Sequence, residues 1–119
     1  MTIKLKRVYE PPADQDGYRM LVDRLWPRGL SEESAHVDLR LRRIAPTTEL
    51  RKWCGHDVEK WPEFQERYRQ ELSNRGDLLG LIRDIERHRK VVTLLVGAKN
   101  EGHNEANVLL DVLKNTPAS

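Results

Sequence analysis

The chain has a single cysteine, Cys54, and no long apolar run, and both shortages exclude whole classes of protein. One cysteine cannot form an internal disulfide, which fits the reducing cytosol, so we expect a cytoplasmic protein. No segment approaches the roughly 18 apolar residues of a membrane span. Residues 1–7 alternate apolar and basic side chains and lack the apolar core of a signal peptide, so we expect no membrane partner.

The chain also lacks a large excess of either positive or negative charge. Lys and Arg number 21 and Asp and Glu number 19, so the formal net charge is only +2. This balance argues against a protein built for electrostatic binding of nucleic acid, although the basic stretch 40–43 keeps an accessory nucleic-acid role open. Glycine-rich nucleotide motifs are missing, and no two His or Cys residues have zinc-ligand spacing. We therefore predict no metal site, and the motifs identify no cofactor.

What the chain does contain is an alternation of strand-like and helix-like segments over the length of one domain. Period-two alternation and short apolar runs predict strands at 3–8, 18–25, 37–42 and 91–96. Helix caps and helical periodicity predict two short helices, beginning near Ser31 and near Thr47 or Thr48, and three longer ones with inward-facing residues that include Phe64, Leu81 and Leu109.

This order predicts a single small α/β domain over 1–119, with a largely parallel sheet of about four strands flanked by helices. Only about nine residues join the first two strands, fewer than a parallel crossover normally needs. An antiparallel start to the sheet is therefore an open alternative.

Polar side chains follow two of the predicted strands. Asp23, Arg24, Trp26 and Arg28 follow the second strand, and Lys99, His103 and Asn104 follow the fourth. Ligands bind beyond the carboxyl ends of parallel strands, so both loops open on one edge if these strands are neighbours. Cations gathered around one cleft need an anionic partner, because they repel one another and are costly to desolvate. We therefore predict a pocket for a small phosphate- or carboxylate-bearing ligand.

Within this pocket we expect Arg24, Arg28 and Lys99 to hold the anion. His103 is the candidate for proton transfer if the protein is an enzyme, since histidine titrates near neutral pH. It is equally plausible as a histidine at a helix start, and Asn104 as a cap or an orienting amide. In the structural alternative, Asp23 pairs with one of these cations inside the fold, and the protein is an interaction module with an ionic cluster.

A third loop, from Trp53 to Asp57, offers two more candidates. We expect Trp53 to form a wall of the pocket, as Trp26 does, and His56 either to line it as a second proton-transfer candidate or to be an ordinary loop residue. Cys54 and His56 do not face each other at this spacing on a helix, so a small buried thiol is the default interpretation of Cys54.

Several long stretches carry a family resemblance: R-V-Y-E-P-P, G-Y-R-M-L-V-D-R-L-W-P-R-G-L-S, I-A-P-T-T-E-L-R-K-W, W-P-E-F-Q-E-R-Y and A-K-N-E-x-H-N. Together they resemble the YeaO-like proteins, a family of small bacterial proteins of unknown function, over nearly the whole chain. The resemblance implies a compact α/β domain with a parallel start to its sheet. The motif positions that it implies here are Asp23, Arg24, Trp26, Pro27, Arg28, Gly29, Trp53, Gly55, His56, Asp57, Lys99, His103 and Asn104.

Two residues depart from the pattern that the resemblance leads us to expect. Cys54 stands where we expect an aromatic residue, which makes a nucleophile there less credible. Gly97 stands where we expect an alanine-like residue, which makes the following loop more flexible. The resemblance implies no activity, and the sequence predicts neither a reaction nor an oligomeric state.

Overall fold

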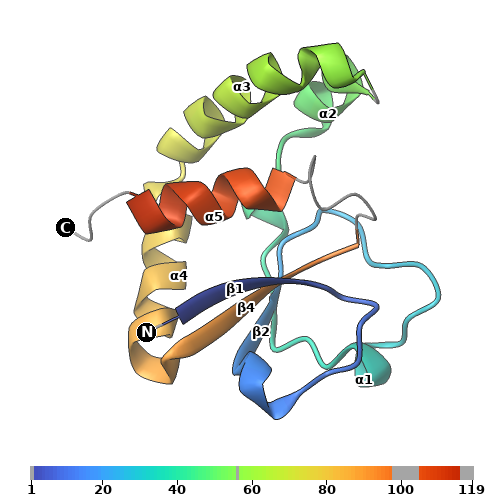
Figure 1. Cartoon of the computed structure of the whole chain (residues 1–119), viewed down its shortest axis with the longest axis vertical. Helices are drawn as coiled ribbons and strands as arrows, with labels where there is room; N and C mark the ends of the chain where they lie inside the picture. Colours follow the sequence, from blue (N-terminus) through green and yellow to red (C-terminus); the bar gives the residue numbers. More distant parts are fainter. Residues whose placement is uncertain (1, 56, 98–104, 116–119) are drawn as a thin grey trace.

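The computed structural model describes residues 2–55, 57–97 and 105–115 (Figure 1). Its strands are β1 (Thr2–Arg7), β2 (Tyr18–Leu21), β3 (Leu39–Arg40) and β4 (Val91–Val96). Its α-helices are α1 (Glu32–Ala35), α2 (Thr48–Cys54), α3 (Trp61–Ser73), α4 (Gly76–Arg89) and α5 (Glu105–Asn115). Three short 3-10 helices complete the described part of the chain: η1 (Asp14–Asp16), η2 (Arg42–Ile44) and η3 (Val58–Lys60).

The four strands form one sheet in the order β1-β4-β2-β3, and every pair of neighbours is parallel. The predicted α/β class with a parallel sheet of about four strands is confirmed. The antiparallel start is wrong, because β4 lies between β1 and β2 and is parallel to both. β3 lies at an edge of the sheet.

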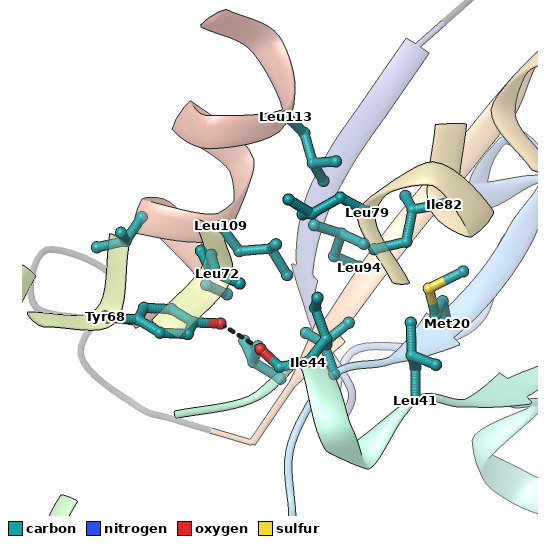
Figure 2. Close-up of a cluster of buried hydrophobic side chains, with 14 of the residues drawn as sticks. Met20, Leu41, Ile44, Tyr68, Leu72, Leu79, Ile82, Leu94, Leu109 and Leu113 are labelled. Carbon is teal, nitrogen blue, oxygen red and sulfur yellow. Dashed lines mark hydrogen bonds between the residues drawn. The ribbon is translucent and has the colours of Figure 1, made fainter. Parts of the chain in front are cut away.

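Two core clusters cover the two faces of the sheet. The larger one joins Met20 and Leu94 of the sheet to buried side chains of α2, α3, α4 and α5. Figure 2 labels members of this cluster from α3, α4 and α5. Within it the Tyr68 hydroxyl donates a hydrogen bond of 2.7 Å to the Ile44 carbonyl, which satisfies both buried groups (Figure 2). The smaller cluster contains Leu21, Leu95, Val8 and Ala35 of α1, so the opposite face is covered by little besides loops.

The connection from β1 to β2 runs back over β4 on this second face. The Thr93 hydroxyl of β4 donates to the Asp16 carbonyl at 2.7 Å, and Lys4 donates to the Gln15 carbonyl at 3.0 Å. Gly17 ends the connection with φ +63°, and a Cβ there would lie 2.4 Å from the Val91 carbonyl oxygen. This short link can form a parallel crossover because a single 3-10 turn, held by side chains of the strands below it, takes the place of a full helix.

Two strand boundaries and one helix face differ from the predictions. β2 ends at Leu21 rather than near residue 25, and Leu25 is 77% exposed, because the chain turns away from the sheet after Val22. β3 has two residues instead of six, since Arg42 already begins η2. Leu81 of α4, predicted to face inward, is 39% exposed, so the buried face of that helix is narrower than its apolar pattern suggested.

The predicted helix starts agree with the structure. The Ser31 side chain accepts a hydrogen bond from the Ser34 N–H at 3.0 Å at the start of α1. The Thr47 hydroxyl accepts one from the Leu50 N–H at 3.2 Å at the start of α2. Such caps satisfy backbone donors that the first helical turn leaves free. Among the described residues, no helix is long and apolar enough to cross a membrane.

Candidate functional site at the carboxyl edge of the sheet

The two polar loops leave from neighbouring parallel strands, as the site prediction required. In the register between β2 and β4, Leu21 lies beside Leu95, and the Val22 N–H donates to the Leu95 carbonyl at 3.1 Å. One step further, the Gly97 N–H donates to the Asp23 Oδ2 at 2.7 Å. Asp23 therefore joins the end of β2 to the end of β4 at the edge where open parallel sheets bind ligands.

Tyr9 brings the Arg28 loop to the same place. Its hydroxyl donates to the Arg28 carbonyl at 3.1 Å, and a Cβ built on Gly97 would lie 3.8 Å from its ring. The Arg28 side chain is exposed and has no hydrogen-bond or ion-pair partner within 2–55, 57–97 or 105–115. Its guanidinium is therefore available to a ligand without breaking a contact in the described structure.

Arg24 differs from Arg28, because its guanidinium is already hydrogen-bonded to backbone carbonyls of the fold. Its Nε donates to the Pro46 carbonyl at 2.6 Å and its Nη2 to the Ala45 carbonyl at 3.3 Å. Arg75 donates to the same Ala45 carbonyl at 2.8 Å. A ligand held by Arg24 has to share this guanidinium with the backbone segment before α2, so its role in the pocket stays a prediction.

The two tryptophans lie on different faces of the sheet. Trp26 packs against the smaller core cluster, donates from its indole nitrogen to the Leu30 carbonyl at 2.8 Å, and has the Arg40 guanidinium 5.3 Å from its ring centre. Trp53 packs against the larger cluster from α2. The structure therefore does not bring the two tryptophans together as walls of one hollow within its described part.

Carboxylates meet at the sheet edge near the start of α5. Burial, the main cause, and the neighbouring Glu105 carboxylate raise the pKa of Asp23 above its usual value. The Gly97 N–H and Arg51 oppose this rise only in part. Arg51 of α2 and Glu105 of α5 form an ion pair of 3.7 Å. The described part of the edge is thus acidic around Asp23 and basic at Arg28.

Cys54 is a buried free thiol, as its default interpretation predicted. Burial, together with the Asp57 and Glu105 carboxylates, raises the pKa of the Cys54 thiol, and Lys60 lowers it only in part. A thiol in this state is a poor nucleophile at neutral pH, because the thiolate is the reactive form.

Four predicted site residues, His56, Lys99, His103 and Asn104, lie outside the residues that the structure describes. Within the described ranges, no group of three or more His, Cys, Asp or Glu side chains could hold a metal ion.

Reasoning from the sequence missed an ionic network under the crossover. Asp16 and Arg19 are only 5% and 4% exposed and form a direct ion pair, and Lys6 donates to the same carboxylate at 2.9 Å. Burial would raise the pKa of Asp16, but hydrogen bonds from Lys6, the Ala13 N–H and Arg19 outweigh it and hold that pKa below its usual value. Arg19 also donates to the carbonyls of residues 35 and 36, at 2.9 and 3.0 Å.

A signal for this network was present in the sequence. The alternation in β1 places Lys6 on the face opposite Ile3, and Arg19 occupies the corresponding face of β2. Two cations on the buried face of a sheet require an acid nearby. The Asp-rich link between the strands supplies it.

Comparisons with known proteins bear on the whole chain. A family model described as "Inactive DUF488-N3 subclade" matches residues 2–118. The chain is 42% identical over 114 residues to the uncharacterized protein YeaO of Escherichia coli, and the match covers 96% of this chain and 98% of YeaO. It is 35% identical over 111 residues to uncharacterized proteins of Mycobacterium tuberculosis and Mycobacterium bovis, with 93% and 92% coverage. No solved structure matches it significantly. These matches confirm the YeaO-like resemblance of the motifs.

Proposed function

Because the chain belongs to the inactive DUF488-N3 subclade, we propose that it binds a small phosphate- or carboxylate-bearing ligand without transforming it. The binding site is the carboxyl edge of the sheet, where the loops after β2 and β4 leave side by side. The observation that carries the proposal is the 2.7 Å hydrogen bond from the Gly97 N–H to Asp23, which ties these two exits together.

Arg28 is the cation that this proposal relies on most. It is exposed, its loop is fastened through Tyr9, and no described side chain neutralises it. Guanidinium groups bind phosphate and carboxylate through paired N–H donors, so an unpaired arginine beside a sheet edge suits an oxyanion. By their positions in the sequence, Lys99 and Asn104 add a second cation and an amide to the same ligand.

Two considerations favour binding over catalysis. The family description names the subclade as inactive, and burial raises the pKa of the Cys54 thiol, which disfavours the reactive thiolate. His103 and His56 are the candidates for proton transfer in the enzymatic alternative. Turnover of a bound phosphate ester that is lost in a His103→Ala variant would replace the binding proposal with that alternative.

The test is a thermal-shift screen of phosphorylated and carboxylated metabolites on the wild type and on Arg28→Ala. A ligand present at 100 times its dissociation constant stabilises the folded state by about 2.7 kcal/mol. For a domain of this size we expect a rise in melting temperature of roughly 10 °C. The matched control is Arg42→Ala, which removes another exposed arginine: it lies in η2, which follows β3, and not in the loops after β2 and β4.

We expect the shift in the wild type and in Arg42→Ala, and its loss in Arg28→Ala. Without ligand, Arg28→Ala should melt like the wild type, because the Arg28 side chain has no partner in the described structure. A large loss of stability in Arg28→Ala alone would instead support the alternative of a structural ionic cluster. A screen in which no anion stabilises the wild type would contradict the proposal.

A nucleic-acid accessory role is a second candidate, and one observation favours it. Arg42 and Arg43 are both exposed and form no ion pair with any described residue. Binding through such a patch weakens steeply as salt rises, because each phosphate contact releases counterions. Affinity for a single-stranded oligonucleotide, measured between about 50 and 200 mM salt, should fall by orders of magnitude if this role exists. Binding that is absent at low salt would remove it.

A further inference from the structure

A groove between α2 and α3 lies apart from the sheet edge, and we call it the α2–α3 groove. Its main hollow has a volume of about 530 Å³ and is lined by Trp53 and Leu50 of α2 and by Arg67 and Gln70 of α3. Cations flank the indole ring: the Arg67 guanidinium is 4.1 Å from the ring centre and the Lys60 ammonium 5.2 Å. Figure 1 shows α2 beside α3 at one end of the molecule.

The groove continues beyond this hollow toward the start of α4. Glu71 and Asn74 line both the main hollow and a second one of about 310 Å³, which is also lined by Arg43, Arg75, Asp77 and Leu78. The α3 stretch between Arg67 and Asn74 spans roughly 10 Å at 1.5 Å per residue. With the second hollow the groove is long enough for about four or five residues of extended peptide at 3.3 Å each.

The ion pairing of the charged side chains is uneven along the groove. Glu71 is already occupied, because its two oxygens accept from the Thr47 N–H at 3.0 Å and the Thr47 hydroxyl at 2.6 Å. Arg43 and Arg75 form no ion pair with any residue of the described chain, and the Arg75 side chain donates to the Ala45 carbonyl, at 2.8 Å. Near Trp53, in contrast, Arg67 is paired with Glu63 at 2.7 Å. The end near α4 therefore has two guanidinium groups outside any described ion pair, in a hollow that Asp77 and Glu71 also line.

We propose that the α2–α3 groove binds a short extended segment of a partner protein. A carboxylate of that segment pairs with Arg43 and Arg75, and an apolar side chain contacts Trp53 and Leu50. Gln70 and Asn74 lie between these ends, where amide side chains can hydrogen-bond to a peptide backbone. Tryptophan and arginine are also the residues that most often anchor protein interfaces.

The mixed lining favours a peptide over a nucleic acid. Glu49, Glu71 and Asp77 lie in the two hollows together with Arg43, Arg67 and Arg75, so carboxylates and guanidinium groups are equal in number. A polyanion needs a groove with a clear excess of cations along its backbone. A peptide with a single acidic side chain needs only guanidinium groups that no carboxylate has already paired, and within the described chain Arg43 and Arg75 are such groups.

The experiment begins with a phage-displayed library of random seven-residue peptides selected on the full chain. We expect the enriched sequences to share an acidic residue and, two to four positions away, an aromatic or aliphatic one. A synthetic peptide of the consensus sequence is then measured by fluorescence polarisation on the wild type, Arg43→Glu and Arg42→Glu. The two variants make the same charge change in the same 3-10 helix, but only Arg43 lines the groove.

We expect Arg43→Glu to weaken binding at least tenfold and Arg42→Glu less than twofold. Both side chains are exposed and unpaired in the described chain, so both variants should keep the melting temperature of the wild type. If Arg43→Glu melts lower, Arg43→Gln replaces it with the same expected direction. Amide chemical-shift changes in labelled protein should centre on Gln70, Asn74 and the Trp53 indole, and not on Gly97.

Three results would overturn the proposal. The first is a selection that yields no shared acidic position, and the second is an equal loss of affinity in Arg42→Glu and Arg43→Glu, which would show that only overall charge matters. The third is a single-stranded oligonucleotide that binds the wild type, causes shifts at Gln70 and Asn74, and is lost in Arg43→Glu. That outcome would assign the groove to nucleic acid.

Discussion

The ionic network beneath the crossover makes a quantitative prediction for Asp16→Asn. This change keeps the size of the side chain but removes the negative charge that faces Arg19 and Lys6. Lys6 can turn its ammonium toward water, because its side chain is 18% exposed. The Arg19 side chain is only 5% exposed and is held by two backbone carbonyls, so its guanidinium remains buried without a counter-charge.

Removing one partner of a buried ion pair typically costs 3–5 kcal/mol, because the other charge stays desolvated and uncompensated. Native domains are stable by only about 5–15 kcal/mol, so Asp16→Asn should lose a large part of the total. The assay is urea unfolding followed by circular dichroism at pH 7. With a urea dependence of about 1–3 kcal/mol per molar, the midpoint should fall by roughly 2 M.

A second ion pair of the same spacing provides the control. Asp84 and Arg87 of α4 also stand three residues apart and are in contact, but both side chains are 55% exposed. Water and salt screen such a pair, so Asp84→Asn should cost less than about 1 kcal/mol. Equal losses in the two variants, or a small loss in Asp16→Asn, would refute the claim that burial decides the strength of this pair.

The same variant has a signature in its pH dependence. The folded pKa of Asp16 lies below the unfolded value, which is about 3.9 for aspartate. The stability that Asp16 contributes is therefore fully present above the unfolded pKa and is lost as the pH falls through the folded pKa. We expect the difference between wild type and Asp16→Asn to be constant from about pH 5 to 7 and to shrink in more acidic solution.

Two further predictions concern the backbone and the thiol. Gly17→Ala should be far more destabilising than Gly29→Ala in urea unfolding. Both glycines have positive φ, but only at Gly17 would a Cβ collide, at 2.4 Å from the Val91 carbonyl oxygen. Similar losses of stability in the two variants would show that the φ angle alone matters. Cys54 should react slowly with iodoacetamide at pH 7.5 in native protein and quickly in urea, since burial raises its pKa and shields it; equal rates would contradict its burial.

The fold was largely predictable because local signals and global topology agree. The capping residues Ser31 and Thr47 and the apolar run of β4 identified their elements directly. The end of β2 was misplaced because the apolar Leu25 extends the pattern of the strand, although the side chain faces solvent. Apolar pattern records which residues could be buried, and only the packed structure decides which are.

The candidate site was predictable only in part. The parallel sheet was predicted, but the adjacency of β2 and β4 was only a condition of the site prediction, because parallel strands can be arranged in several orders. Given that adjacency, the contact between Asp23 and Gly97 follows from their positions just after the two strands. The bonds from Arg24 to the segment before α2 could not be foreseen, since they depend on how a loop without periodicity folds back. That Lys6 and Arg19 need an acid could be inferred from the sequence, but that Asp16 supplies it could not, because the pairing requires that the link cross β4.

The order of the strands has a consequence for biosynthesis. Among the described strands, β4 alone is hydrogen-bonded to β1, and it lies between β1 and β2 in the sheet. It is nevertheless the last of these strands to be synthesised. At 5–20 residues per second, the stretch 22–90 that separates β2 from β4 takes roughly 3–14 s to translate. During that interval β1 and β2 have exposed edges on a nascent chain, so holdase chaperones have a defined window in which to act.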